Sequence, residues 1–120
     1  MRIFKNTWFA RYADKEGISD SELKEAVNRL EAGQADANLG GDVYKVRVAR
    51  AGKGKSGGYR VIVLFRSEER TFYVYGFAKS ERDNISGKEL RNMKRAAKKY
   101  FFMTSDQINE RVKNGQLIEL

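Results

Sequence analysis

Three strand-like segments follow one another between residues 43 and 78, and this succession limits the folds open to the chain. Residues 43–49 alternate, with apolar side chains on one face and basic side chains on the other. Residues 59–66 are apolar on both faces, as expected of a central strand, and residues 71–78 form the third segment. Because the connections are short, consecutive strands pair antiparallel. The sequence therefore predicts a three-stranded antiparallel meander.

Helix signals precede the predicted meander. We expect a short N-terminal edge strand over residues 2–5, after which Asn6 can cap a first helix. This helix is expected to bury Trp8, Phe9 and Tyr12. Ser19 with Glu22 predicts a capping box for a second amphipathic helix that ends near Gly33. Residues 34–42 contain two adjacent glycines and no periodicity, which is typical of a loop.

Further helix signals follow the meander. Ser86 with Glu89 predicts a helix that reaches about residue 102, and Thr104 can cap a last helix that carries Ile108 and Val112. We therefore predict an α+β fold, in which two N-terminal helices pack on a small antiparallel sheet and one or two helices follow it. The length suits a single domain over residues 1–120, in which the role of residues 103–120 stays open.

The charge of the chain is concentrated in its middle. Residues 44–100 carry 16 basic and 5 acidic side chains, whereas the chain as a whole has a net charge of +8. Such a basic segment indicates RNA or DNA as a partner. The absence of Cys and His excludes disulfides and the commonest metal ligands and general base, so we expect no metal and no cofactor. Without an apolar run long enough to span a membrane, the protein is expected to be cytoplasmic.

A glycine-rich basic segment over residues 53–60 runs directly into the second strand. Its glycines allow close backbone approach to a ligand, and Lys53, Lys55 and Arg60 supply positive charge, so it can grip a phosphate. The alternative is an ordinary solvated hairpin turn. A Walker A nucleotide site is excluded, because Ala49 stands where that pattern requires glycine and a strand, not a helix, follows.

Cations from neighbouring strands are expected to converge beside this segment. In a meander the end of the third strand lies beside the start of the second, so Lys79 and Arg82 can approach Arg60, and Lys45 and Arg47 can face the same groove. Like charges held together favour an anionic ligand. Tyr59 and Tyr75 are further RNA-binding candidates, because their rings can stack on bases. Lys94 and Lys98 either contact RNA phosphates or belong to an ordinary solvated helix face.

Several segments together resemble one family of bacterial proteins. They are Met1-Arg2-Ile3-Phe4-Lys5 with Trp8-Phe9, Leu39-Gly40-Gly41, Lys45 with Arg47-Val48-Ala49, residues 52–60, and residues 75–85. With these segments, residues 1–102 resemble the RelE/ParE superfamily of toxins from type II toxin–antitoxin pairs, and most closely the HigB-like RelE branch. The resemblance implies two N-terminal helices on an antiparallel sheet, followed by a C-terminal helix.

The resemblance also implies a function. Toxins of this branch are ribosome-dependent endoribonucleases that cut mRNA, and each is restrained by a cognate antitoxin that often carries a helix-turn-helix domain. The family's catalytic lysines and arginines correspond to Lys53, Lys55, Arg60, Lys79 and Arg82. Relatives often add a Tyr or His to the site, whereas this chain has no His and has Ser86 near where a Tyr is expected.

The residues and the resemblance together predict RNA cleavage without a metal. In this hypothesis Arg60 clamps the phosphate during in-line attack by the ribose 2'-hydroxyl, and a lysine with a lowered pKa acts as general base. Two other functions stay open. One is ParE-like inhibition of DNA gyrase without catalysis, and the other is RNA binding alone.

Overall fold

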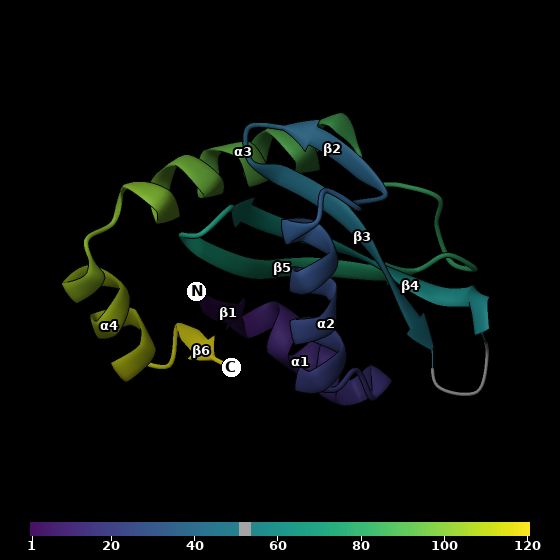
Figure 1. Cartoon of the computed structure of the whole chain (residues 1–120), viewed down its shortest axis with the longest axis horizontal. Helices are drawn as coiled ribbons and strands as arrows, with labels where there is room; N and C mark the ends of the chain where they lie inside the picture. Colours follow the sequence, from purple (N-terminus) through teal and green to yellow (C-terminus); the bar gives the residue numbers. More distant parts are fainter. Residues whose placement is uncertain (51–53) are drawn as a thin grey trace.

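The computed structural model describes residues 1–50 and 54–120, apart from the side chains of residue 50 and residues 54–57. The α+β fold is confirmed, with helices on both sides of one sheet (Figure 1). The elements are β1 (Arg2–Asn6), α1 (Thr7–Glu16), α2 (Asp20–Glu31), β2 (Ala37–Gly40), β3 (Val43–Arg50), β4 (Gly54–Arg66), β5 (Arg70–Ala78), α3 (Gly87–Phe102), α4 (Ser105–Lys113) and β6 (Leu117–Glu119). None of the helices in the described residues is long and apolar enough to cross a membrane.

The sheet contains the predicted meander and extends beyond it on both sides. Its strand order is β2-β3-β4-β5-β1-β6, and β3, β4 and β5 pair antiparallel. The expectation of an N-terminal edge strand is wrong, because β1 lies between β5, to which it is parallel, and β6, to which it is antiparallel. The two chain ends are therefore neighbours in Figure 1, and the Leu120 amide donates to the Ile3 carbonyl at 2.9 Å.

Two predicted loops prove to contain strand. Within residues 34–42, β2 pairs with β3 through Ala37↔Lys45 and Asn38↔Tyr44, because backbone partners supplied by β3 outweigh the low strand propensity of this segment. The glycine-rich segment also differs from its prediction: β4 begins at Gly54 and pairs with β3 from there, so residues 54–60 belong to a long hairpin. Lys53 lies outside the described residues.

The two faces of the sheet carry separate apolar clusters. α1 and α2 cover one face, where Phe9, Leu23 and Val27 pack against β3, β4 and β5. α3 and α4 cover the other face, where Ala97 and Ile108 pack against the strands. Burial of apolar side chains on both faces explains why the central strands carry apolar residues at successive positions.

The caps of the helices agree with the sequence in most cases. Asn6 caps α1 by accepting from the Phe9 amide at 2.7 Å, and Ser86 forms a capping box with Glu89 at the start of α3.

The expectation that Trp8 is buried is wrong, since 43% of this residue is exposed. It lies in the first turn of α1, at the rim of the sheet, and stacks on Tyr75 with ring centroids 4.5 Å apart.

A bulge in β5 determines which of its side chains face α3. The pairing with β4 shifts between Ile62↔Tyr75 and Val63↔Tyr73, so Val74 is an extra residue. Beyond the bulge, Phe77 packs in the α3-side cluster and lies opposite Arg60 of β4. The bulge thereby sets the surroundings of Arg60.

Candidate functional site

Arg47 on β3 and Arg60 on β4 lie directly opposite each other in the antiparallel ladder. Opposed residues of such a ladder project from the same face of the sheet. Arg60 lies two residues before Ile62 and four before Leu64 on β4, so its side chain is on the same face as theirs. Ile62 and Leu64 pack in the α3-side cluster, and both arginines therefore belong to that face. Only 8% of Arg60 is exposed. Two permanently charged guanidinium groups are therefore held near each other at the end of the meander.

One carboxylate lies between the two guanidinium groups. Oδ2 of Asp36 is 3.7 Å from Nε of Arg47 and 3.8 Å from Nε of Arg60. These distances exceed the roughly 2.7–2.9 Å of a direct charge-assisted hydrogen bond. The backbone holds Asp36 in place, since its amide donates to the Lys45 carbonyl at 3.0 Å. Asp36 is therefore shared by both arginines and bonded closely to neither.

Two nitrogen atoms of the arginine pair have unused hydrogen-bonding capacity. Nε of Arg47 and Nη1 of Arg60 are buried, and no acceptor within the described part of the chain bonds to either. A buried donor without an acceptor costs free energy, more so when it carries charge. An anion that bonded to these nitrogen atoms would relieve that cost. The arrangement is thus chemically suited to a phosphate group.

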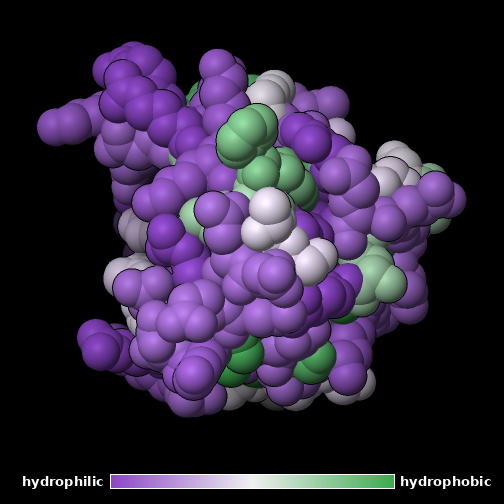
Figure 2. All heavy atoms as spheres, turned by 90° about the vertical axis from the view of Figure 1, so that its left-hand side faces the viewer, coloured by the Kyte–Doolittle hydropathy of each residue, from purple (hydrophilic) through white to green (hydrophobic). Residues whose placement is uncertain are grey.

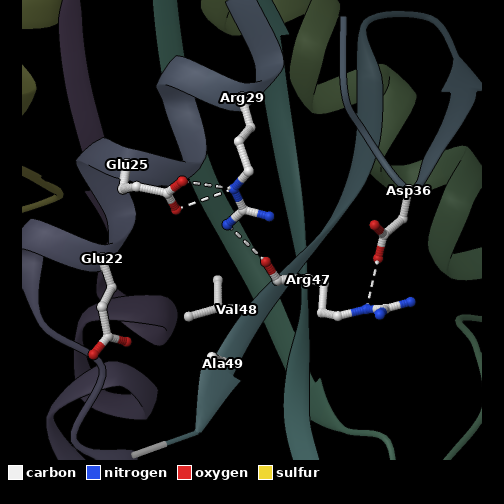
Figure 3. Close-up of a pocket in the computed structure, with 7 residues that line it drawn as sticks. All are labelled: Glu22, Glu25, Arg29, Asp36, Arg47, Val48 and Ala49. Carbon is white, nitrogen blue, oxygen red and sulfur yellow. Dashed lines mark hydrogen bonds and ion pairs between the residues drawn. The ribbon is translucent and has the colours of Figure 1, made fainter. Parts of the chain in front are cut away.

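A hollow of about 480 Å³ opens beside Arg47, where β3 runs past the end of β2 (Figure 3). α2 contributes its other wall through Glu22, Glu25 and Arg29. Arg29 is already engaged, because its Nε donates to Glu25 at 3.0 and 3.1 Å and its Nη2 donates to the Arg47 carbonyl at 2.9 Å. Figure 3 shows Asp36 and the Arg47 side chain pointing toward each other, away from Glu25. The acidic α2 wall disfavours a phosphate on that side of the hollow.

Comparison with known proteins identifies the family of this chain. The family model of the RelE toxin of the RelE / RelB toxin-antitoxin system matches residues 1–120. The chain belongs to the RelE toxin family. Its partner is accordingly an antitoxin. In this RelE-family toxin, the residues expected to form a site can now be placed one by one.

Arg82 is hydrogen-bonded to three neighbouring groups. Its Nη2 donates to Glu89 at 2.7 Å, its Nη1 to the Tyr75 hydroxyl at 3.1 Å, and its Nε to the Asn84 carbonyl at 2.9 Å. These bonds connect the 79–86 segment with β5 and the first turn of α3. Glu89 of α3 thus supplies a carboxylate partner for Arg82. Arg82 also lies 5.5 Å from the ring centroid of Phe77, the residue opposite Arg60, so its catalytic role stays a prediction.

The Arg82–Glu89 pair makes stability depend on pH. The Arg82 guanidinium lowers the pKa of Glu89 from 4.5 to about 2, with help from the Ser86 amide. Since the unfolded chain takes up this proton first, the stabilisation is complete above pH 4.5 and is lost as the pH falls toward 2. We expect wild type to be more stable than Glu89→Gln at pH 6, by a margin that shrinks toward pH 2 in urea-unfolding curves.

The control for this prediction is Glu110→Gln, which changes an exposed carboxylate on α4. The free energy of unfolding of this variant should stay parallel to that of wild type across the same pH range. A Glu89→Gln curve that is equally parallel to wild type would show that the Arg82–Glu89 pair contributes nothing. Because a third of each side chain is exposed, solvent screening keeps the effect modest.

Neither tyrosine proposed for base stacking has a free ring. Tyr59 is 2% exposed, and its hydroxyl donates to Glu16 at 3.0 Å, so a base cannot reach it. Tyr75 stacks on Trp8 and also carries Arg82 at 5.8 Å from its ring centroid. The stacking role of Tyr59 is therefore corrected, whereas that of Tyr75 stays a prediction. Tyr59 points to the α1 side, because it alternates with Arg60 along β4.

Two of the predicted lysines, Lys45 and Lys79, lie near the arginine pair, and a third, Lys94, lies at the β2–β3 turn. Lys45 precedes Arg47 by two residues on β3 and so shares its face of the sheet. Lys79 follows β5, and its amide reaches the Gly58 carbonyl at 3.5 Å, as the meander geometry predicts. Lys94 of α3 lies over the β2–β3 turn, where a Cβ added to Gly41 would come within 3.0 Å of its side chain. Their RNA-binding and catalytic roles stay predictions.

Lys98 lies apart from this group. It lines a second hollow with Arg66, Lys99, Phe101 and Phe102, at the opposite end of β4 from Arg60. Figure 2 shows this end of the molecule as mostly hydrophilic with a small hydrophobic island. Phe102, which is 91% exposed, lies at this end. The structure therefore does not bring Lys98 to the arginine pair.

The structure adds Asp36 to the residues that the sequence indicated. The sequence offered no clear signal for it, because residues 34–42 read as a loop and their pairing with β3 is a long-range feature. Two predicted residues cannot be judged in the same way. Lys53 and the side chain of Lys55 lie outside the described residues. Among the described residues, the predicted cations Arg47 and Arg60 lie directly opposite each other.

Proposed function

We propose that this toxin is an endoribonuclease that cuts mRNA bound to the ribosome, without a metal or other cofactor. The observation that carries the proposal is the opposed Arg47–Arg60 pair, with buried nitrogen atoms that bond to nothing among the described residues. A planar guanidinium is suited to bidentate contact with phosphate oxygens. Membership of a toxin family supports a harmful activity on a cellular target.

In the proposed reaction the ribose 2'-oxygen attacks the adjacent phosphorus in line. A new 2'-oxygen–phosphorus bond forms as the bond to the 5'-oxygen breaks, which leaves a cyclic phosphate and a 5'-hydroxyl. Arg60 stabilises the charge that grows on the phosphate oxygens during this step. A lysine, Lys53, Lys55 or Lys79, accepts the 2'-hydroxyl proton, and the leaving 5'-oxygen takes a proton from water or from a second, protonated lysine.

The ribosome has a physical role in this proposal. The chain contains no histidine, the commonest general base near neutral pH. Alignment of the 2'-hydroxyl with the scissile bond must then supply much of the rate, and a ribosome that holds mRNA in one conformation provides it. The free protein is therefore expected to be a poor ribonuclease in the cytoplasm. Assignment to the HigB-like branch, with an antitoxin that carries a helix-turn-helix domain, belongs to the same proposal.

Primer extension on cellular mRNA after induced expression tests the proposal. We expect cuts within translated regions, at a constant position in the codon, and their loss when the start codon of the reporter mRNA is removed. Cuts that persist without translation would contradict ribosome dependence. Growth arrest with intact mRNA would contradict nuclease activity, and a DNA supercoiling assay would then identify gyrase inhibition. Salt-dependent RNA binding without cleavage would indicate a binding module.

A further inference from the structure

Asp36 is the carboxylate that the described residues place between Arg47 and Arg60. Its Oδ2 lies 3.7 Å and 3.8 Å from their Nε atoms, and 26% of its side chain is exposed. Figure 3 shows the carboxylate directed at Arg47 across the face of β3. Nε of Arg60 faces Asp36, and Nη1 of the same guanidinium has no hydrogen-bond partner among the described residues. Asp36 therefore contacts the arginines without blocking the Arg60 nitrogen that lacks a bond.

Without a carboxylate, the arginine pair would be poorly ordered. Like charges directly opposite each other on neighbouring strands repel, and their side chains turn apart. Asp36 counteracts this repulsion from a fixed point, since its amide is bonded to β3 and the next residue, Ala37, pairs with Lys45. The carboxylate can thus hold both guanidinium groups in the orientation that a single phosphate requires.

Asp36 also sets the net charge of the site. Two guanidinium groups and one carboxylate leave a single positive charge. The phosphodiester inside an RNA chain carries one negative charge, whereas a terminal phosphate carries about −1.5 to −2 at neutral pH. With Asp36 present, an internal phosphodiester offsets the net charge of these three side chains, while Lys45 and Lys79 keep the surroundings positive. A terminal phosphate brings a second negative charge close to the carboxylate.

We propose that Asp36 positions Arg47 and Arg60 and makes the site prefer an internal phosphodiester over a terminal phosphate. The inference rests on the proposed function, in which this pair of arginines holds the scissile phosphate. It explains how a strongly basic toxin selects the interior of an mRNA chain over free nucleotides. Asp36 acts through the arginines and is a positioning and specificity residue.

Two small probes test the inference on the purified, folded protein at pH 8. One is a 2'-deoxy dinucleoside monophosphate, which has a monoanionic phosphodiester and cannot be cleaved. The other is a 2'-deoxynucleoside 5'-monophosphate, which has a dianionic terminal phosphate at this pH. We expect wild type to bind the phosphodiester more tightly. Asp36→Asn should shift the ratio of the two dissociation constants about tenfold toward the terminal phosphate, because one nearby negative charge is removed.

Matched variants separate the charge of Asp36 from its shape. Asparagine keeps the size of the side chain, and Asp36→Glu, which keeps the charge, should retain the wild-type preference. Asp42→Asn is the control, because Asp42 also pairs with an arginine, Arg66 at 2.8 Å, at the other end of β4. It should leave the ratio unchanged. An equal shift in Asp42→Asn would overturn the inference.

The remaining outcomes distinguish this inference from the proposed function. If Arg60→Ala abolishes binding of both probes but Asp36→Asn keeps the wild-type ratio, only the role of Asp36 is wrong. If Arg60→Ala changes neither affinity, or wild type binds neither probe, the arginines do not form the anion site and both proposals about them fail. Ribosome-dependent cleavage, measured by primer extension, then decides whether the toxin is a nuclease that uses another site.

Discussion

Arg60→Ala is expected to lower ribosome-dependent mRNA cleavage by about 100- to 1,000-fold and to abolish growth arrest, because removal of one preorganised donor to a developing oxyanion has an effect of this size. Arg60→Lys should recover little activity, since a lysine keeps the charge and loses the planar fork. Cleavage is measured on programmed ribosomes with purified toxin. Circular dichroism and thermal unfolding establish that each variant is folded.

The matched control for Arg60 lies on the same strand. Arg66 lies six residues after Arg60 on β4, an even spacing that puts both side chains on the same face of the sheet. Arg66 is, however, paired with Asp42 at 2.8 Å and lies 4.6 Å from the ring centroid of Phe101. Arg66→Ala should therefore leave cleavage within about twofold of wild type, as expected for a surface arginine outside the site. A folded Arg60→Ala toxin that still arrests growth would contradict the assignment of Arg60.

Phe72→Ala is expected to have the largest effect on stability, a loss of about 3–5 kcal/mol in the free energy of unfolding. Phe72 is fully buried on β5, where it stacks on Phe4 at 5.1 Å and on Tyr100 at 4.7 Å. These contacts join β1, β5 and α3, so the substitution leaves a cavity where three elements meet. Urea unfolding followed by circular dichroism measures the change.

Phe102→Ala is the control for this prediction. Phe102 is the same residue type at the end of α3 but is 91% exposed, so its replacement should change stability by no more than about 0.5 kcal/mol. The contrast separates burial from residue type. If Phe72→Ala cost under about 1 kcal/mol, the packing of α3 on the sheet would be different from the one described here.

Much of the fold could be predicted because the signals that define it are local. The Ser86–Glu89 capping box spans one helical turn, and the alternation of Lys45, Val46 and Arg47 spans three residues. Pairing between distant segments was harder to predict. β6 lies more than a hundred residues from its partner β1, and β2 becomes a strand only because β3 offers it hydrogen bonds.

The candidate site was predicted only in part, for the same reason. Strand alternation put Lys45 and Arg47 on one face, and the meander put Arg60 near them. The ion pair of Arg82 was not predicted, because its partner, Glu89, comes from the first turn of α3, which the strand pattern does not place. Tyr59 was misassigned because aromatic residues on either face of a buried strand look alike in a sequence.

The sequence by itself determined the types and order of most elements, the basic middle of the chain and its lack of histidine, because these depend on neighbouring residues or on composition. The tertiary structure alone decided that Arg60 faces Arg47 and shares Asp36 with it, that a bulge at Val74 turns Phe77 toward Arg60, and that Arg82 is held by Glu89. These contacts depend on strand register and helix packing, because the partners come from different elements of the fold.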